Sequence, residues 1–200
     1  INNIMNSKTI GICGYSGSGK SFYSSKIKEN VGRCFILSCD RYYKTVPKDI
    51  DCTKYNFDHP DAIDFKQLCI DIYRLKMGLL THLPFYDFKT HSRLDKTQQI
   101  KLEKDTTIVL EGIFILCKKE LRDNLDLLIF IDTDEDLCFQ RRLKRDIEER
   151  GRTKNSVIEQ YLEFVKPSQD KFIKPFIKFA DLTIDNNNKD YKYDLPLILK

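Results

Sequence analysis

The sequence lacks several features that mark whole classes of protein. No apolar run approaches the length of a membrane-spanning helix, and no signal peptide is recognisable. The seven cysteines include no Cys-x-x-Cys pair, and such a scattered, odd set is typical of reduced thiols rather than of a disulfide framework or a zinc site. No internal repeat is present. We therefore expect a cytoplasmic protein with no membrane partner, folded as a single domain over residues 1–200.

The composition is that of a soluble globular protein. Of the 200 residues, 41% are hydrophobic and 32% are charged, which suits a soluble domain with a full core. The net charge of +4 favours an anionic ligand but is too diffuse to indicate a nucleic-acid partner.

Residues 14–21 read Gly-Tyr-Ser-Gly-Ser-Gly-Lys-Ser and fit the spacing of a phosphate-binding loop. The apolar run at 9–13 predicts a buried strand before this loop, and 22–30 predicts a helix after it. Glycines allow several backbone N–H groups to converge on a phosphate at the helix start. A glycine-rich turn with a chance lysine is the alternative. We predict a nucleoside triphosphate site made of Gly14, Tyr15, Ser16, Gly17, Ser18, Gly19, Lys20 and Ser21.

Two acidic residues follow apolar runs that predict buried strands. Asp40 comes after the run at 34–38, and Glu111 comes after the run at 107–110. Residues at the carboxyl ends of parallel strands line the ligand crevice of an α/β sheet. Asp40 is therefore a candidate catalytic base, or else a helix cap. Glu111 is a candidate for Mg²⁺ binding together with Ser21, or else a buried ion-pair carboxylate.

The middle of the chain predicts a long loop and a projecting hairpin. Residues 43–60 have neither helical nor strand periodicity, which is typical of a functional or mobile loop. Asp61 is predicted to cap an amphipathic helix that runs through Met77 and ends at Gly78. The runs 83–88 and 99–102 predict the two arms of a hairpin insertion at about 83–104. Its aromatic residues form a plausible wall for a flat base, although a lone histidine such as His91 is more often structural.

After a further predicted strand at 127–131, residues 132–134 are expected to cap a helix rich in arginine. Arg142 and Arg145 share one face of it, and Arg141 is expected to point elsewhere. The interspersed carboxylates, Asp146 among them, also fit a solvated, ion-paired helix. The functional interpretation is a lid over about 141–156, hinged at Gly151, whose guanidinium groups clamp phosphate oxygens.

Residues beyond 155 predict helices broken at Pro167 and Pro175, an edge strand at 180–184 and a closing helix from Asp190. The alternation of strands and helices predicts an α/β fold with a doubly wound, mainly parallel sheet and helices on both faces. Its candidate residues supply what phosphoryl transfer needs, namely positioning, metal binding and charge stabilisation. The residues alone therefore predict a kinase of a small hydroxyl compound.

Ten further stretches occur in order between about residues 8 and 182, and with them the chain resembles the uridine-cytidine kinase family. The most specific are Asn-Phe-Asp-His-Pro-Asp-Ala at 56–62 and His-Ser-Arg at 91–93. The others lie at 38–43, 84–88, 111–113, 141–142, 145–147, 149–152, 160–161 and 164–167.

The resemblance implies a role for each matching residue. Asp40 is similar to the base that activates the nucleoside 5′-hydroxyl, and Lys20 and Arg145 complete the catalytic set. The implied nucleoside site consists of Tyr43, Phe57, Asp58, Tyr86, Phe88, His91, Arg142, Arg152 and Gln160. The implied lid arginines are Arg145, Arg150 and Arg152.

Within that site the resemblance places the ribose hydroxyls on Asp58 and Arg142, and the pyrimidine edge on Tyr86 and His91. A deoxy sugar would then be disfavoured, because a buried Asp58 would be left underpaired. The resemblance also implies ATP and Mg²⁺ as phosphoryl donor and cofactor, a pyrimidine nucleoside 5′-monophosphate as product, and a homotetramer.

Two other functions fit part of the pattern. A kinase of another hydroxyl compound, such as nicotinamide riboside, pantothenate or ribulose phosphate, would share the phosphate loop but use a different acceptor wall. A non-catalytic nucleotide-binding regulator would share the fold. The joint presence of Lys20, Ser21, Asp40 and Glu111 argues against the regulator, because decayed enzymes usually lose one such residue.

Overall fold

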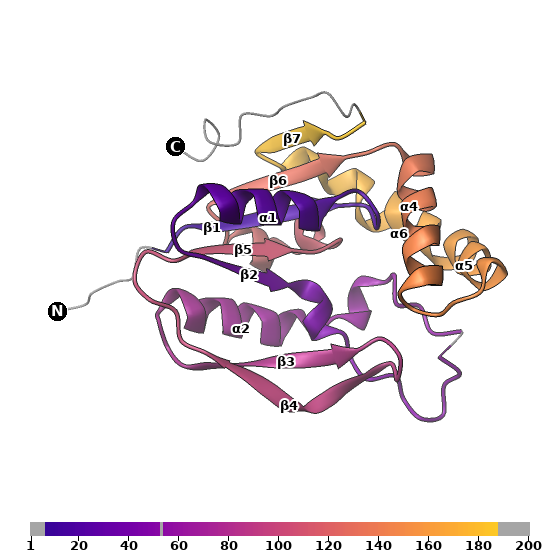
Figure 1. Ribbon diagram of the computed structural model, residues 1–200, viewed down its shortest axis with the longest axis horizontal. Coiled ribbons are helices and arrows are strands. Elements are labelled where there is room, and N and C mark those ends of the chain that lie inside the picture. The colour runs from indigo at the N-terminus through magenta and orange to yellow at the C-terminus, as the bar shows by residue number, and fades with distance from the viewer. Residues whose placement is uncertain (1–6, 53, 188–200) are drawn as a thin grey trace.

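Five parallel strands form the main sheet of the computed structural model, which describes residues 7–52 and 54–187 (Figure 1). Their spatial order is β2-β5-β1-β6-β7. They are β1 (Thr9–Gly14), β2 (Cys34–Ser38), β5 (Thr107–Glu111), β6 (Leu127–Asp132) and β7 (Leu182–Asp185). The edge strand predicted at 180–184 is β7, two residues later at its start. The helix predicted from Asp190 lies outside the described residues.

Helices cover both faces of this sheet, and the alternation of side chains along each strand decides which face they meet. On β1, Ile10 and Ile12 are fully buried and pack with Ile27 of helix α1 (Lys20–Asn30). Cys13 belongs instead to the core on the opposite face, together with Ile72 of helix α2 (Phe65–Lys76). The predicted doubly wound arrangement is therefore confirmed.

Helix α2 begins three residues later than the sequence pattern predicts. Its N-cap is Asp64, whose carboxylate accepts a hydrogen bond of 3.1 Å from the backbone N–H of Gln67. Asp61 lies in a short 3₁₀ turn, Pro60–Ala62, and Ile63 is extended at φ −105° and ψ 138°. The predicted cap at Asp61 is wrong, because an extended residue separates that turn from the helix.

The hairpin forms a two-stranded antiparallel sheet of its own, composed of β3 (Thr81–Asp87) and β4 (Ser92–Ile100). The predicted second arm at 99–102 coincides only with the end of β4, since most of this polar strand is exposed and carries no alternating apolar signal. Arg41, next to the strand end of β2, holds the hairpin in place. Its guanidinium donates to the carbonyl oxygen of Pro84 (3.1 Å) and to Oε1 of Gln98 (2.8 Å).

The remaining helices are α3 (Lys119–Arg122), α4 (Glu135–Glu148), α5 (Lys154–Gln160) and α6 (Lys166–Phe172). The predicted break at Pro167 is wrong. A π-helical segment, Tyr161–Val165, joins α5 directly to α6, so the helical backbone runs on through Pro167 in the first turn of α6. Pro175 does open a new 3₁₀ turn, Lys174–Phe179. Over residues 7–52 and 54–187, no helix combines the length and apolar character that a bilayer span requires.

Candidate active site

The phosphate loop has a shape that only glycine permits at two positions. Gly17 and Gly19 have φ angles of 88° and 98°, in the left-handed region. A Cβ atom on Gly17 would also lie 2.3 Å from the carbonyl oxygen of Cys138. The far side of the loop is anchored at the carbonyl of Ser18, which accepts hydrogen bonds of 2.9 Å from Thr133 Oγ1 and from Asn186 Nδ2. The loop is thus fixed before any phosphate arrives.

Lys20 begins α1 directly after the loop. Its ammonium donates to the carbonyl oxygens of Gly14 (3.1 Å) and Tyr15 (2.8 Å). Burial lowers the pKa of Lys20, while the nearby Cys13 thiol and the carboxylates of Asp40 and Glu111 act to raise it. The Lys20 ammonium therefore lies at the phosphate loop, near the carboxylates of Asp40 and Glu111.

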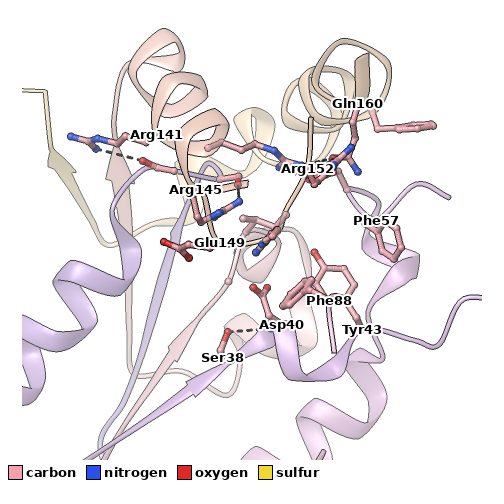
Figure 2. Close-up of a pocket in the computed structure, with 18 of the residues that line it drawn as sticks. Ser38, Asp40, Tyr43, Phe57, Phe88, Arg141, Arg145, Glu149, Arg152 and Gln160 are labelled. Atoms are coloured by element: carbon pink, nitrogen blue, oxygen red, sulfur yellow. Dashed lines mark hydrogen bonds and ion pairs between the residues drawn. The ribbon is translucent and has the colours of Figure 1, made fainter. Parts of the chain in front are cut away.

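A cavity of about 860 Å³ opens from the phosphate loop toward the hairpin (Figure 2). This volume is in the range of small-molecule sites. The predicted site residues that line it are Ser16, Gly17, Gly19, Lys20, Ser21, Asp40, Tyr43, Phe57, Asp58, Phe88, His91, Glu111, Arg142, Arg145, Arg150, Arg152 and Gln160. Four others, Gly14, Tyr15, Ser18 and Tyr86, are not among the lining residues, and Tyr15 and Ser18 are buried.

Asp40 lies in the 3₁₀ turn Cys39–Tyr42 that follows β2, and its backbone N–H donates to Ser38 Oγ (3.3 Å). Because Ser38 is in register with Glu111 across β2 and β5, both acidic residues lie at neighbouring strand ends. Figure 2 shows the Asp40 carboxylate directed into the cavity, below Arg145 and Glu149. Burial raises the pKa of Tyr43, and the carboxylates of Asp40 and Asp58 raise it further, so the Tyr43 hydroxyl keeps its proton.

The Glu111 carboxylate lies beside the start of α1. Oε1 accepts from Ser21 Oγ (3.3 Å), and Oε2 accepts from Ser24 Oγ (2.9 Å). A carboxylate and a hydroxyl next to a phosphate loop are the hard oxygen ligands that suit Mg²⁺. Residues 7–52 and 54–187 contain no cluster of three or more His, Cys, Asp or Glu that could hold a metal alone. These two residues therefore fit a metal that is also held by phosphate oxygens and water.

Asp58 pairs with Arg142 inside the protein. The two carboxylate oxygens lie 3.2 and 3.4 Å from Nη1 and Nη2 of Arg142, and the side chains are 7% and 6% exposed. Gln160 Oε1 accepts from Arg142 (3.0 Å) and from Arg152. Arg142 is thus a partner of Asp58 in the absence of a nucleoside, and the weaker binding of a deoxy sugar stays a prediction.

Aromatic rings form the wall opposite the phosphate loop. The ring of His91 stacks on Phe57 at 4.7 Å, and Phe88 contacts Tyr43 at 5.9 Å and Tyr86 at 5.2 Å between ring centroids. Burial lowers the pKa of His91, and the positive charges of Arg152 and Arg150 lower it further. The imidazole is therefore neutral near pH 7, with one ring nitrogen to donate and one to accept.

The arginines on and after α4 all face the cavity. Arg145 Nη2 lies 3.4 Å from Ser16 Oγ, and the Arg150 guanidinium lies 4.4 Å from the centre of the Phe88 ring. Arg141 lines the cavity too, with Nη1 3.5 Å from the carbonyl oxygen of Gly17, and its side chain leaves α4 in a different direction from that of Arg145 (Figure 2). Helix α4 begins at the loop side of the cavity, which brings its first arginine over the phosphate loop.

Three structurally important residues have no role in the sequence-based interpretation. Arg93 donates to the carbonyls of Tyr42 (2.9 Å) and Tyr43 (2.9 Å), which ties the hairpin to the Asp40 turn. Asn186 supports the phosphate loop from the end of β7. Asp146, expected on a solvated face, is 0% exposed. Arg93 was visible as part of the His-Ser-Arg motif, and Asp146 stands four residues after Arg142 and beside Arg145, but no sequence signal indicated the role of Asn186.

A phosphate loop, strand-end carboxylates and a row of arginines around one cavity define a P-loop kinase of small molecules. Solved structures share this fold. A possible uridine kinase from Bacillus stearothermophilus superposes with a TM-score of 0.67 at 20% identity, covering 90% of this chain and 89% of that one. Phosphoribulokinase from Rhodobacter spheroides gives 0.66 at 13% identity, covering 90% and 70%.

The model of the Phosphoribulokinase / Uridine kinase family matches residues 9–190, and the chain belongs to this family. It is 49% identical over 184 residues to uridine-cytidine kinase A of Dictyostelium discoideum, covering 91% of this chain but only 36% of that longer protein. It is 44% identical over 179 residues to the uridine kinase of Macrococcus caseolyticus, covering 88% of this chain and 86% of the relative.

Proposed function

We propose that the chain is a uridine/cytidine kinase that transfers the γ-phosphate of ATP to the 5′-hydroxyl of uridine or cytidine, giving UMP or CMP. The observation that carries this proposal is one continuous cavity. The phosphate loop lies at one end, the Asp58–Arg142 pair and the ring of His91 lie at the other, and Asp40 lines the space they share. The family relatives named as uridine kinases support the same choice of acceptor.

The residues of the site divide the work of phosphoryl transfer. The loop and Lys20 hold the triphosphate, and Asp40 accepts the proton of the 5′-hydroxyl. As the 5′-oxygen bonds to the γ-phosphorus, the bond from that phosphorus to the β,γ-bridging oxygen breaks and ADP leaves. Ser21 and Glu111 would hold Mg²⁺, which neutralises charge on the β- and γ-phosphates when bound. Arg145 and Arg150 lie near the phosphates and stabilise the charge that develops on the transferred phosphoryl group and on the β-phosphate of the departing ADP.

The acceptor end of the cavity selects the nucleoside. Asp58 and Arg142 offer a carboxylate and a guanidinium to the ribose hydroxyls. A neutral His91 can donate to one pyrimidine and accept from another, which suits both uracil and cytosine. The ring of Phe57 stacks on His91 and so supports the imidazole from behind.

The assembly and location belong to the same proposal. The family resemblance supports a homotetramer. All seven cysteines are free, four of them only half-buried or exposed, which fits the reducing cytoplasm.

Steady-state kinetics with labelled ATP test the proposal, using uridine, cytidine and nicotinamide riboside as acceptors and GTP as a second donor. We expect label in UMP and CMP. Label in the nicotinamide riboside product but in neither pyrimidine product would contradict the acceptor assignment. Binding of nucleoside and ATP without any product would instead identify a regulator.

A further inference from the structure

Asp146 is a buried carboxylate on α4 at the centre of the arginine cluster. Its Oδ1 accepts hydrogen bonds from Arg145 Nε (2.9 Å) and Nη2 (2.8 Å) and lies 3.5 Å from Arg150 Nη1. Its Oδ2 lies 3.6 Å from Arg142 Nε, and its backbone carbonyl accepts from the N–H of Arg152 (3.0 Å). One residue therefore contacts four of the arginines that line the cavity.

Helical geometry explains this convergence. Arg142 lies four residues before Asp146, on the same face of α4, and Arg150 follows four residues after it. A carboxylate with 0% exposure would be very unfavourable alone, so its charge has to be balanced by these guanidinium groups. Burial acts to lower the pKa of Arg142, but the carboxylates of Asp58 and Asp146 outweigh it and raise that pKa above its ordinary value.

The arginines around Asp146 reach three different parts of the site. Arg142 pairs with Asp58 at the acceptor end, Arg145 approaches Ser16 in the phosphate loop, and Arg150 lies over Phe88 of the hairpin. A free arginine side chain loses rotamer entropy when it is fixed. Fixing these side chains in advance removes that cost from the step in which phosphate charge develops.

We propose that Asp146 is a positioning residue that sets Arg145 over the phosphate loop and Arg142 against Asp58, and so ties the donor and acceptor ends of the cavity together. The inference rests on the proposed function. Within the described residues, Asp146 Oδ2 and Arg142 Nε face each other, both buried and neither hydrogen-bonded. A small rotation of Arg142 when a nucleoside binds Asp58 would bring these two atoms within hydrogen-bonding distance. Nucleoside binding at the acceptor end would then act on Asp146, which in turn holds Arg145.

The test compares D146N with E148Q, which neutralises an exposed carboxylate two residues further along the same helix. We expect D146N to lower kcat by roughly 10²-fold, because misplaced catalytic groups cost about that much, and E148Q to stay within about twofold. D146E, which keeps the charge, should recover part of the loss. Thermal unfolding of each variant checks that it is folded. A folded D146N with unchanged kcat would overturn the proposal.

A double-mutant cycle on ADP affinity, measured by calorimetry, separates positioning from general damage. We expect D146N to weaken ADP binding about tenfold in the wild-type background, as for loss of a charged hydrogen bond. It should have less than a twofold effect in an R145A background, where the residue it positions is gone. Equal effects in both backgrounds would overturn the proposal. If D146N does not fold, D146E is carried through the same cycle with the same criterion.

ADP binding needs no acceptor, so the two proposals fail separately. A wild-type protein that phosphorylates neither uridine nor cytidine but gives a non-additive ADP cycle would refute the proposed function and support positioning by Asp146. Normal uridine phosphorylation with an additive ADP cycle would support the proposed function and refute positioning by Asp146.

Discussion

Replacing Asp40 by asparagine removes a proton acceptor and leaves the local structure intact. The 3₁₀ turn that carries Asp40 is held by its backbone N–H on Ser38 Oγ, and that bond does not involve the carboxylate. Over residues 7–52 and 54–187, no ion pair engages the Asp40 side chain. We therefore expect the free energy of unfolding to change by no more than about 0.5 kcal/mol.

The effect on turnover should be far larger than the effect on stability. A positioned base contributes roughly 10²–10⁴-fold to the rate, which corresponds to about 2.7–5.5 kcal/mol of the activation barrier. The contacts proposed to bind the nucleoside, at Asp58, Arg142 and His91, are untouched by the change. Uridine affinity should therefore stay within about threefold, since binding is separate from the proton transfer.

Steady-state kinetics and equilibrium titration with uridine measure these two quantities on the same preparation. The matched control is Asp49→Asn, which neutralises an exposed carboxylate in the long loop before Asp58. It should leave both kcat and uridine affinity unchanged. A D40N variant with wild-type kcat would remove Asp40 from the mechanism, and an equal loss of kcat and affinity would make it a binding residue.

Further predictions concern the acceptor and metal ends of the cavity. Because the pKa of His91 is below its ordinary value of 6.5, the imidazole stays neutral as pH falls from about 8 to 6.5. Uridine affinity, measured by titration at each pH, should therefore be constant over this range and weaken at lower pH. The H91A variant should not show this weakening at low pH. Asp58→Asn breaks an ion pair whose side chains are 6–7% exposed and should lower the free energy of unfolding by about 3 kcal/mol. A urea midpoint at the wild-type value would mean that the buried charge of Arg142 does not need Asp58 for its stabilisation. Glu111→Gln should raise the Mg²⁺ concentration for half-maximal activity by roughly tenfold while metal-free ATP binding stays the same, and an unchanged Mg²⁺ profile would remove Glu111 from the metal site.

The sequence predicted best the parts of the fold that depend on short, buried runs. The strands that end at Ser38 and Glu111 are mostly apolar, so their position in a parallel sheet follows from their pattern. Because parallel strands end at one edge, the proximity of Asp40 and Glu111 to the phosphate loop could be predicted as well. The doubly wound fold was predictable for the same reason.

The parts that could not be predicted depend on contacts between distant segments. Asp146 has the sequence surroundings of a solvated charge, yet it is buried among Arg142, Arg145 and Arg150, and Arg142 in turn pairs with Asp58, which is distant in sequence. The polar strand β4 lacks an apolar face, so its pairing with β3 left no periodic signal. Arg93 was visible only as part of a family motif, and its bonds to two backbone carbonyls emerge from the folded chain.

The hairpin's attachment has a consequence for how the protein can change over evolutionary time. The hairpin pairs with no strand of the main sheet. Arg41 and Arg93 make the four hydrogen bonds described above that attach it, and three of these are accepted by backbone carbonyls, those of Pro84, Tyr42 and Tyr43. A carbonyl is present whatever side chain the residue bears. Substitutions along this wall at positions other than Arg93 and Gln98 therefore preserve these bonds, so a lineage can acquire a new acceptor there while the phosphate machinery stays unchanged.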